Sequence, residues 1–131
     1  MLTLDLRYLA YTAILTAALW TPYVVSQVIT NGSLKPENYK DPTPRPVPLW
    51  GQRANRAHIN AVESFAPFAA LVIIAHLADK ANGMTVVWAE TFFWLRVAHA
   101  VTYWTAIPFI RTLIFTAGFV CVCGLLWNVV S

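Results

Sequence analysis

Long apolar runs separated by short polar segments dominate the chain. No charged residue occurs from position 8 to position 34, and none occurs from position 112 to position 131. About 20 apolar residues are enough to cross the hydrocarbon layer of a bilayer. The first run is also longer than the apolar part of a signal peptide, which has about 7–15 residues. We therefore predict membrane-spanning helices over residues 6–29 and 111–130.

Two less uniform apolar segments lie between these runs. They predict two further spans, over residues 53–77 and 84–106, with a polar turn between them and a third turn at Pro108. The first connection, residues 31–52, contains five prolines. Proline fixes φ and removes a hydrogen-bond donor, so this segment is predicted to be an extended loop.

The composition supports a membrane protein. Hydrophobic residues make up 58% of the chain and charged residues only 11%, with a mean hydropathy of +0.56. Soluble domains average about 25% charged residues, so this chain has too few charges to cover a surface in water. We predict an all-α integral membrane protein: a single domain over residues 1–131, built as a four-transmembrane-helix bundle.

The basic residues favour one orientation and argue against a nucleic-acid partner. The net charge is +3, and the bases flank the apolar runs, as topology signals do. Residues 31–56 and the third turn carry Lys35, Lys40, Arg45, Arg53, Arg56 and Arg111, whereas the other side carries Arg7 and Lys80. We expect the first and third loops to be cytoplasmic and both termini to lie opposite. The short chain without a retention signal favours a bacterial inner membrane.

Polar residues inside the second span form a stripe. Arg56, Asn60, Glu63 and Pro67 are spaced i, i+4, i+7 and i+11, so they fall within about 60° of one another on a helix. Arg53 lies at the edge of the stripe. A charge at bilayer depth is costly, and therefore it is expected to face the bundle interior or water and to have a function.

The third span carries a similar stripe. Arg96, His99 and Tyr103 are spaced i, i+3 and i+7 on one face, and Arg111 follows at the start of the fourth span. Glu63 and Arg96 lie deepest and are predicted to pair. The spacing leaves three interpretations open: structural contacts between helices, a polar ligand site, or ion or proton conduction.

Other chemistry has little support in the sequence. The three histidines, His58, His76 and His99, share no spacing typical of metal ligands, so no metal site is predicted. Cys121 and Cys123 lie inside an apolar run and point to different sides of a helix, so we interpret them as apolar packing residues.

The residue types in the two stripes suit a particular kind of ligand. Several arginines at one level favour an anion with carboxylates, because a guanidinium binds a carboxylate through two parallel hydrogen bonds. Asn60 and Glu63 suit amide and ammonium groups, and Tyr103 can donate to a carboxylate or thiolate. An amino-acid-like or peptide anion at the membrane edge satisfies these groups together.

These residues also resemble a known family. RAHINAVESFAPF at 56–68 and RVAHAVTY at 96–103, followed by Pro108 and Arg111, are similar to the helix signatures of the MAPEG family, membrane-associated proteins in eicosanoid and glutathione metabolism. The resemblance implies a homotrimer that binds glutathione between subunits. The implied glutathione contacts are Arg56, Asn60, Glu63, His99, Tyr103 and Arg111, with Arg53 and Arg96 beside them.

The same resemblance implies a reaction and an alternative. Arg111 would stabilise the glutathione thiolate, which would attack a lipophilic electrophile or reduce a hydroperoxide arriving from the membrane. However, Ile59 stands where several members have arginine, and the first span has no arginine facing the site. These differences favour the alternative of a non-catalytic lipid-binding or scaffold protein. A channel or transporter is a third hypothesis, although no inverted repeat is evident.

Overall fold

The computed structural model of the chain describes residues 1–33 and 35–131, and within these ranges all regular secondary structure is helical. Leu34, which belongs to the predicted loop, lies outside the described residues. In chain order the helices are α1 (Leu4–Ala18), α2 (Trp20–Asn31), the short 3₁₀ helix η1 (Pro36–Tyr39), α3 (Leu49–Leu77), α4 (Gly83–Thr105) and α5 (Ile110–Val130).

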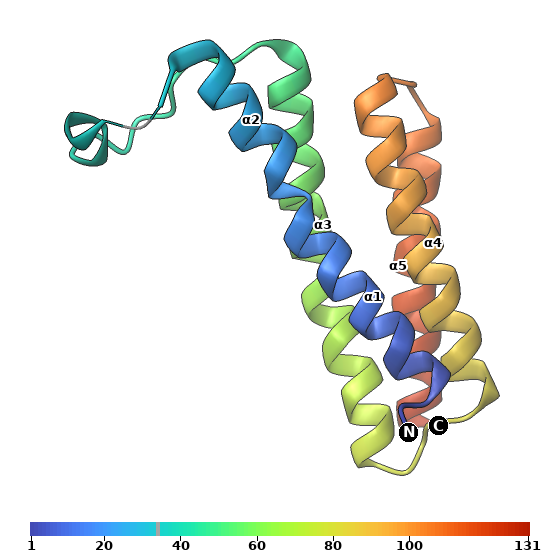
Figure 1. The fold of residues 1–131 in the computed structure, drawn as a ribbon. Coiled ribbons are helices and arrows are strands. Elements are labelled where there is room, and N and C mark those ends of the chain that lie inside the picture. Colours follow the sequence, from blue (N-terminus) through green and yellow to red (C-terminus); the bar gives the residue numbers. More distant parts are fainter. Residues whose placement is uncertain (34) are drawn as a thin grey trace.

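α1 and α2 form one long rod with a break at Leu19 (Figure 1). The break lies one turn before Pro22, whose nitrogen has no hydrogen to donate to the carbonyl of Ala18. Leu19 is buried at the break against Ala61 of α3 and Ala100 of α4. Beyond this point α2 packs on α3 alone, whereas α1 packs on both α3 and α4.

α3 is the longest helix and begins earlier than residue 53, where the second span was predicted to start. Its first residue is Leu49, directly after Pro48. Proline is well tolerated at the start of a helix because the first N–H groups there have no partner inside the helix. With 29 residues, α3 is about 44 Å long at 1.5 Å per residue. It is therefore longer than the hydrocarbon layer, which is about 30 Å thick.

α4 and α5 form a hairpin whose ends are defined by local hydrogen bonds and turn conformations. At the start of α4, the Asn82 side chain accepts from the backbone N–H groups of Met84 and Thr85, and the Thr85 hydroxyl accepts from the Asn82 N–H. At the other end, Ala106 and Phe109 adopt left-handed φ values of 57° and 63°, which reverse the chain before α5.

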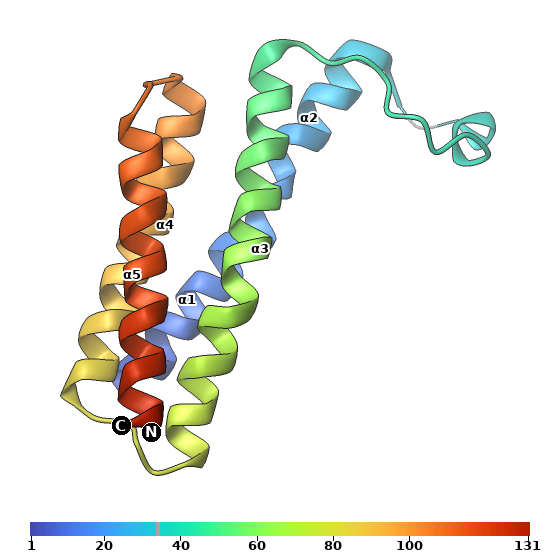
Figure 2. The ribbon, with the colours of Figure 1, turned by 180° about the vertical axis from the view of Figure 1, so that it is seen from behind.

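The apolar core lies in the half of the bundle that contains both chain ends. Phe68 of α3 and Phe92 of α4 stack there with ring centroids 4.0 Å apart. Val72, Ala89, Cys121 and Leu125 complete this buried cluster. α1, α3, α4 and α5 come together at this end, whereas α2 and the first half of α3 diverge from the α4–α5 hairpin at the other end (Figures 1 and 2).

The helices have the dimensions of a membrane protein. Leu4–Asn31, Leu49–Leu77 and Ile110–Val130 are each long and apolar enough to cross a membrane. α4 is less apolar because it carries Glu90 and Arg96, but its 23 residues run alongside α5 over most of its length (Figure 2). The predicted all-α, four-helix membrane bundle is therefore confirmed.

The outer surface of the bundle suits contact with lipid. Large apolar side chains are exposed on every long helix, among them Ile14 of α1, Ile73 of α3, Trp94 of α4 and Phe119 of α5. Such a surface would be unfavourable in water and is favourable in a hydrocarbon solvent.

Candidate functional site

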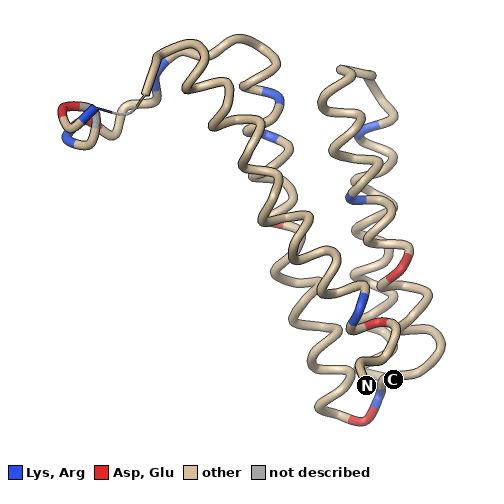
Figure 3. The backbone as a smooth tube through the Cα atoms, in the orientation of Figure 1, with Lys and Arg blue, Asp and Glu red and all other residues tan. Residues whose placement is uncertain are grey.

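The eight polar residues predicted to form a site lie on α3, α4 and α5. Figure 3 shows that basic positions occur from the middle of the bundle to the end where α3 diverges from α4. Arg96 and His99 are buried, with exposed fractions of 2% and 3%. Arg56 and Glu63 are exposed in the single chain, and the remaining four are half-buried: Arg53, Asn60, Tyr103 and Arg111. Of the eight, only Arg96 and His99 are therefore enclosed by the chain itself.

Arg96 is a buried cation in the middle of α4. Its Nη1 donates a hydrogen bond of 3.1 Å to the Ser64 hydroxyl on α3, and its guanidinium carbon lies 5.3 Å from the centre of the Phe92 ring. Gly118 on α5 leaves room for the group, because a Cβ at that position would lie 3.0 Å from Nη2. Nε is buried without a hydrogen-bond partner. Three helices thus position a guanidinium that is only partly satisfied.

Glu63 does not form the predicted ion pair with Arg96. Both residues line a cavity of about 230 Å³ between α3, α4 and α5. Among the described residues, however, an ion pair within 4.0 Å joins His76 to Asp5 and none joins Glu63 to Arg96. Successive residues on a helix point about 100° apart, so Ser64 faces Arg96 while Glu63 stays at the exposed rim.

His99, Tyr103 and Arg111 form a continuous set of contacts between α4 and α5. The His99 and Tyr103 rings meet edge to face with centroids 4.9 Å apart. The Arg111 guanidinium carbon lies 4.5 Å from the centre of the Tyr103 ring, a cation–π contact that keeps the cation beside the phenol. Phe115 lies next to His99, with ring centroids 6.4 Å apart. The structure thus brings these three predicted residues together.

The polar residues in the first half of α3 are not joined to that set. Within the described chain, no hydrogen bond or ion pair links Arg53, Arg56 or Asn60 to α4 or α5. Arg56 lines a surface pocket with Tyr23 of α2 and Arg45 of the loop. The side-chain oxygen of Asn60 is buried without a partner. In the single chain Arg53, Arg56 and Asn60 are therefore separate from the polar contacts between α4 and α5, whereas Glu63 lines a cavity together with Arg96.

A second polar cluster, which the sequence analysis did not predict, lies at the opposite end of the bundle. Asp5 of α1 has an exposed fraction of 2%. Its Oδ2 lies 2.8 Å from Nε2 of His76 on α3 and accepts a 3.1 Å hydrogen bond from the Thr85 hydroxyl on α4. Its Oδ1 accepts from the Leu6 N–H and from the Thr3 hydroxyl. This one carboxylate connects three helices.

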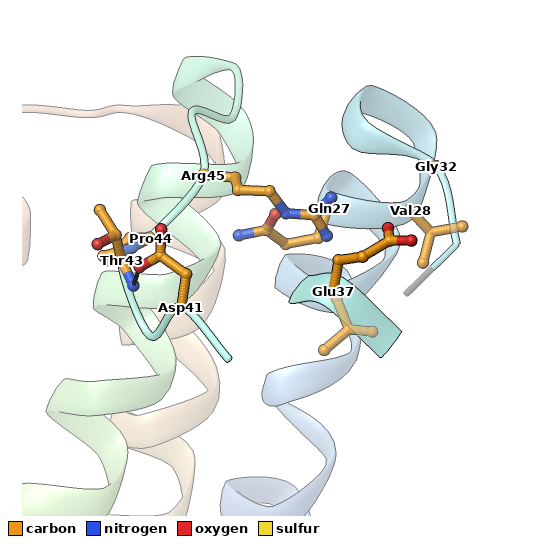
Figure 4. A pocket seen from close by; sticks show the side chains of 9 residues that line it. Gln27, Val28, Gly32, Glu37, Asp41, Thr43, Pro44 and Arg45 are labelled. Atoms are coloured by element: carbon orange, nitrogen blue, oxygen red, sulfur yellow. Dashed lines mark hydrogen bonds between the residues drawn. The ribbon is translucent and has the colours of Figure 1, made fainter. Parts of the chain in front are cut away.

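The Pro-rich loop forms a pocket of its own outside the bundle (Figure 4). This pocket has a volume of about 410 Å³ and is lined by Glu37, Asp41 and Arg45 together with residues of α2. Arg45 crosses it and donates a long, 3.5 Å hydrogen bond to the Asn31 carbonyl. Arg45 was counted above as one of the basic residues that indicate orientation. None of the eight predicted site residues lines this pocket.

Two neighbours of Arg96 were missed by the sequence analysis although their signals were present. Ser64 is the next residue after Glu63 and is the one that binds Arg96. Gly118 is a small residue in a bulky apolar span, where it lets the guanidinium approach α5. Glycine in a membrane helix often marks such a close approach.

Fold and site together define a helical membrane protein with an arginine-rich polar site near one end of the bundle. The model of the MAPEG family matches residues 8–131, a range that includes all eight predicted site residues. The chain belongs to the MAPEG family, as its sequence resemblance predicted. A comparison with curated proteins gave no match.

Proposed function

We propose that the protein is a membrane-bound, glutathione-dependent transferase or peroxidase that acts on lipophilic electrophiles or hydroperoxides. Membership of a family whose members generally use glutathione supports this function. The observation that carries it is the contact between Arg111 and Tyr103, with the guanidinium carbon 4.5 Å from the ring centre. A cation close to a thiol favours its thiolate form, and a phenol beside it can donate a hydrogen bond.

The polar residues suit each group of glutathione. Its two carboxylates suit the guanidinium groups of Arg53 and Arg56, through paired hydrogen bonds. Its ammonium group suits the Glu63 carboxylate, and a peptide amide suits Asn60, whose buried side-chain oxygen has no partner in the chain. Arg96 lies deeper and adds positive charge, and the buried His99 packs against Tyr103.

Arg111 and Tyr103 would act on the thiol. A nearby cation favours the thiolate over the thiol, and a phenolic O–H can donate to the sulfur. The thiolate then attacks the electrophilic carbon, and the leaving group departs with the bonding electrons. With a hydroperoxide, two glutathione molecules give one disulfide, one alcohol and one water.

The assembly proposed for this function is a homotrimer. Arg56 and Glu63 are exposed in the single chain, and among the described residues no hydrogen bond or ion pair joins Arg53, Arg56 or Asn60 to α4 or α5. A neighbouring copy would bring complementary halves together, so that glutathione binds between subunits. We further propose that loops one and three face the cytoplasm of a bacterial cell and that substrates arrive from the inner membrane.

The test is a glutathione titration on the detergent-purified oligomer with 1-chloro-2,4-dinitrobenzene as the electrophile. We expect saturable conjugation and a thiolate absorbance on adding glutathione. Arg111→Ala should lower the rate by about 10²-fold or more, the scale of removing one electrostatic stabiliser of the reacting anion. The matched control is Arg7→Ala, at the opposite end of the bundle. A folded oligomer that neither binds nor turns over glutathione would refute the proposal.

A non-catalytic lipid-binding or scaffold role on the same fold is the second candidate. The observation in its favour is that α1 and α2 carry a single base, Arg7, and that it lies in the first turn of α1, away from the predicted site residues. This role predicts co-purified lipid or fatty acid and no response to glutathione in the same titration.

A further inference from the structure

The Pro-rich loop between α2 and α3 holds an arginine that has no role in the glutathione site described so far. We propose that Arg45 is a further binding residue of that site and that it holds, together with Arg56, one of the two carboxylates of glutathione. The inference rests on the proposed function, because it concerns the same ligand. It adds to the site a segment that none of the eight predicted residues occupies.

A polar pocket of about 330 Å³ lies where the loop meets α2 and the first turns of α3. Arg45 and Arg56 both line it, so two guanidinium groups share one cavity. Its other polar side chains are neutral: Tyr23, Gln52 and Asn55. No aspartate or glutamate of the described chain lines it. Two cations and neutral donors are complementary to an anion, and a guanidinium binds a carboxylate through paired hydrogen bonds.

The loop is the neighbouring segment that adds a second guanidinium to this pocket. α2 packs on α3 at this level and contains no lysine or arginine. Arg56 therefore gains a cationic neighbour from Arg45, which precedes it by 11 positions and lies outside the helix.

The Arg45 guanidinium is not neutralised by the chain. It is half-buried, and it donates a long hydrogen bond of 3.5 Å to the uncharged Asn31 carbonyl. Glu37 and Asp41 line the neighbouring loop pocket together with Arg45 (Figure 4). Among the described residues, however, neither carboxylate forms an ion pair with Arg45 within 4.0 Å. The cation therefore keeps donors free for a ligand.

Hydrogen bonds hold the loop in place directly after Arg45. The Asn31 side chain on α2 donates a 3.1 Å hydrogen bond to the Pro46 carbonyl. The Gln52 side chain on α3 donates a 3.0 Å hydrogen bond to the Val47 carbonyl. The prolines on both sides of Arg45 also fix the backbone φ. A side chain presented by a constrained loop loses less conformational entropy when it binds a ligand.

The position of the pocket suits one end of a tripeptide. Arg56 and Glu63 lie on one stripe of α3 and are separated by about 10 Å along the helix axis, at 1.5 Å per residue. An extended chain of three residues also spans about 10 Å. A ligand that places its ammonium group near Glu63 can therefore extend along the stripe and place a carboxylate between Arg56 and Arg45.

The experiment measures equilibrium dialysis of radiolabelled glutathione against the detergent-purified oligomer, together with KM and kcat of conjugation. Arg45→Gln should raise Kd and KM for glutathione about tenfold, because a charge-assisted hydrogen bond is lost. It should leave kcat within about twofold, since Arg45 does not contact the thiol. Arg45→Lys keeps the charge without the planar fork and should give an intermediate Kd.

The matched control is Lys40→Gln, which removes an exposed base of the same loop that lines neither loop pocket. It should leave Kd, KM and kcat unchanged. An equal rise of Kd in Lys40→Gln and Arg45→Gln would show a general effect of loop charge and would overturn the proposal.

Two analogues identify the carboxylate and exclude an effect on loop structure alone. Glutathione ethyl ester lacks the charge of the glycine carboxylate, and a second analogue has hydrogen in place of the γ-glutamyl carboxylate. Arg45→Gln should weaken the analogue that lacks its partner group far less than it weakens glutathione, because losses at two groups in contact are not additive. An equal factor for glutathione and both analogues would overturn the proposal.

The outcomes distinguish this inference from the proposed reaction. Binding that depends on Arg45 without any conjugation would support the inference and refute the catalytic function. Conjugation by the wild type with an unchanged KM in Arg45→Gln would overturn the inference alone. A wild-type oligomer that binds no glutathione would overturn both.

Discussion

Single residues at the two ends of the bundle differ in how well their buried polar atoms are satisfied. The Asp5 carboxylate has hydrogen-bond partners on both oxygens. Arg96 Nε and Asn60 Oδ1, in contrast, are buried without partners. Most buried polar atoms in native proteins are paired, and the exceptions often mark places where a ligand binds. The Asp5 contacts are therefore expected to contribute stability, whereas the unpartnered atoms of Arg96 and Asn60 are expected to serve binding.

Asp5→Asn should destabilise the bundle. The amide has a single acceptor oxygen and places an N–H₂ group against one set of donors. Either His76 and the Thr85 hydroxyl, or the Leu6 N–H and the Thr3 hydroxyl, therefore lose their acceptor. We expect a loss of about 1–3 kcal/mol, the usual cost of a buried unsatisfied donor. Thermal unfolding in detergent, followed by circular dichroism, measures it. Arg7→Gln, an exposed change one half-turn later, is the control, and an equal loss in both would contradict the explanation.

Arg96→Met should leave the stability unchanged or raise it. The substitution removes a buried charge that has no counter-ion in the chain and keeps most of the side-chain length. Replacing buried charges by apolar residues of similar volume is often neutral or stabilising by about 1–4 kcal/mol. Ser64 keeps its hydrogen bonds to the α3 backbone. A clear drop in melting temperature, measured without added lipid, would show that Arg96 is needed for packing.

At the scale of helices, close contacts depend on small residues. Gly124 of α5 lies against the Trp88 indole of α4, and Gly51 of α3 lies against Ser26 of α2. A Cβ at Gly124 would come within 2.3 Å of the indole, far inside normal contact distance. These glycines set how near the paired helices approach one another.

Gly124→Ala should therefore weaken the α4–α5 hairpin. The indole of Trp88 would have to leave its position, and overpacking of this kind costs about 1–3 kcal/mol. The matched control is Gly83→Ala at the first residue of α4, where a Cβ meets nothing within 4 Å. Melting temperatures of the two variants distinguish them. If Gly124→Ala has the same melting temperature as the wild type, the tight contact with Trp88 does not limit the packing.

Apolar run length was enough to predict four helices, because the bilayer requires continuous apolar segments of a known length. It could not predict the break at Leu19, since the apolar run continues unchanged across it. It also placed the start of α3 too late, because Arg53 and Arg56 were read as the edge of the span. In the structure α3 already begins at Leu49, so the helix is longer than its apolar part.

Helical spacing predicted which polar residues share a face, but not what each face contacts. The Tyr103–Arg111 contact joins residues that lie close in sequence across one turn. Ser64 replaced Glu63 as the partner of Arg96 because a difference of one position rotates a side chain by about 100°. The pair Asp5–His76 spans 71 positions, and no spacing rule connects residues of different helices over that distance.

At the scale of the whole molecule, all the connections lie at two opposite ends. The Pro-rich loop and the α4–α5 turn are at the end where the helices diverge, and the α3–α4 turn is at the end of the termini (Figure 1). Basic residues gather at the first of these ends, and proteins keep such loops in the cytoplasm. We therefore expect the polar site to open toward the cytoplasmic side.

Single cysteines test this orientation. In a background with Cys121→Ala and Cys123→Ala, Thr43→Cys in the loop should react with a membrane-impermeant maleimide only from the cytoplasmic side. In the opposite turn Asn82 is held by hydrogen bonds to Thr85 and Asn128 and is therefore a poor position for a cysteine. The exposed residue Ala78 in the same turn is the better choice, so Ala78→Cys is the second reporter. It should react only from the outside of intact cells. The reverse pattern would place the site on the external face.

The two chain ends lie side by side on the face opposite the polar site (Figures 1 and 2). The last residue of one copy could thus be joined to the first residue of another by a linker that never crosses the bilayer. Such tandem fusions would permit one copy in a covalent array to carry a substitution while its neighbours remain wild type. The geometry of the termini makes the protein suitable for counting how many intact copies a single functional site requires.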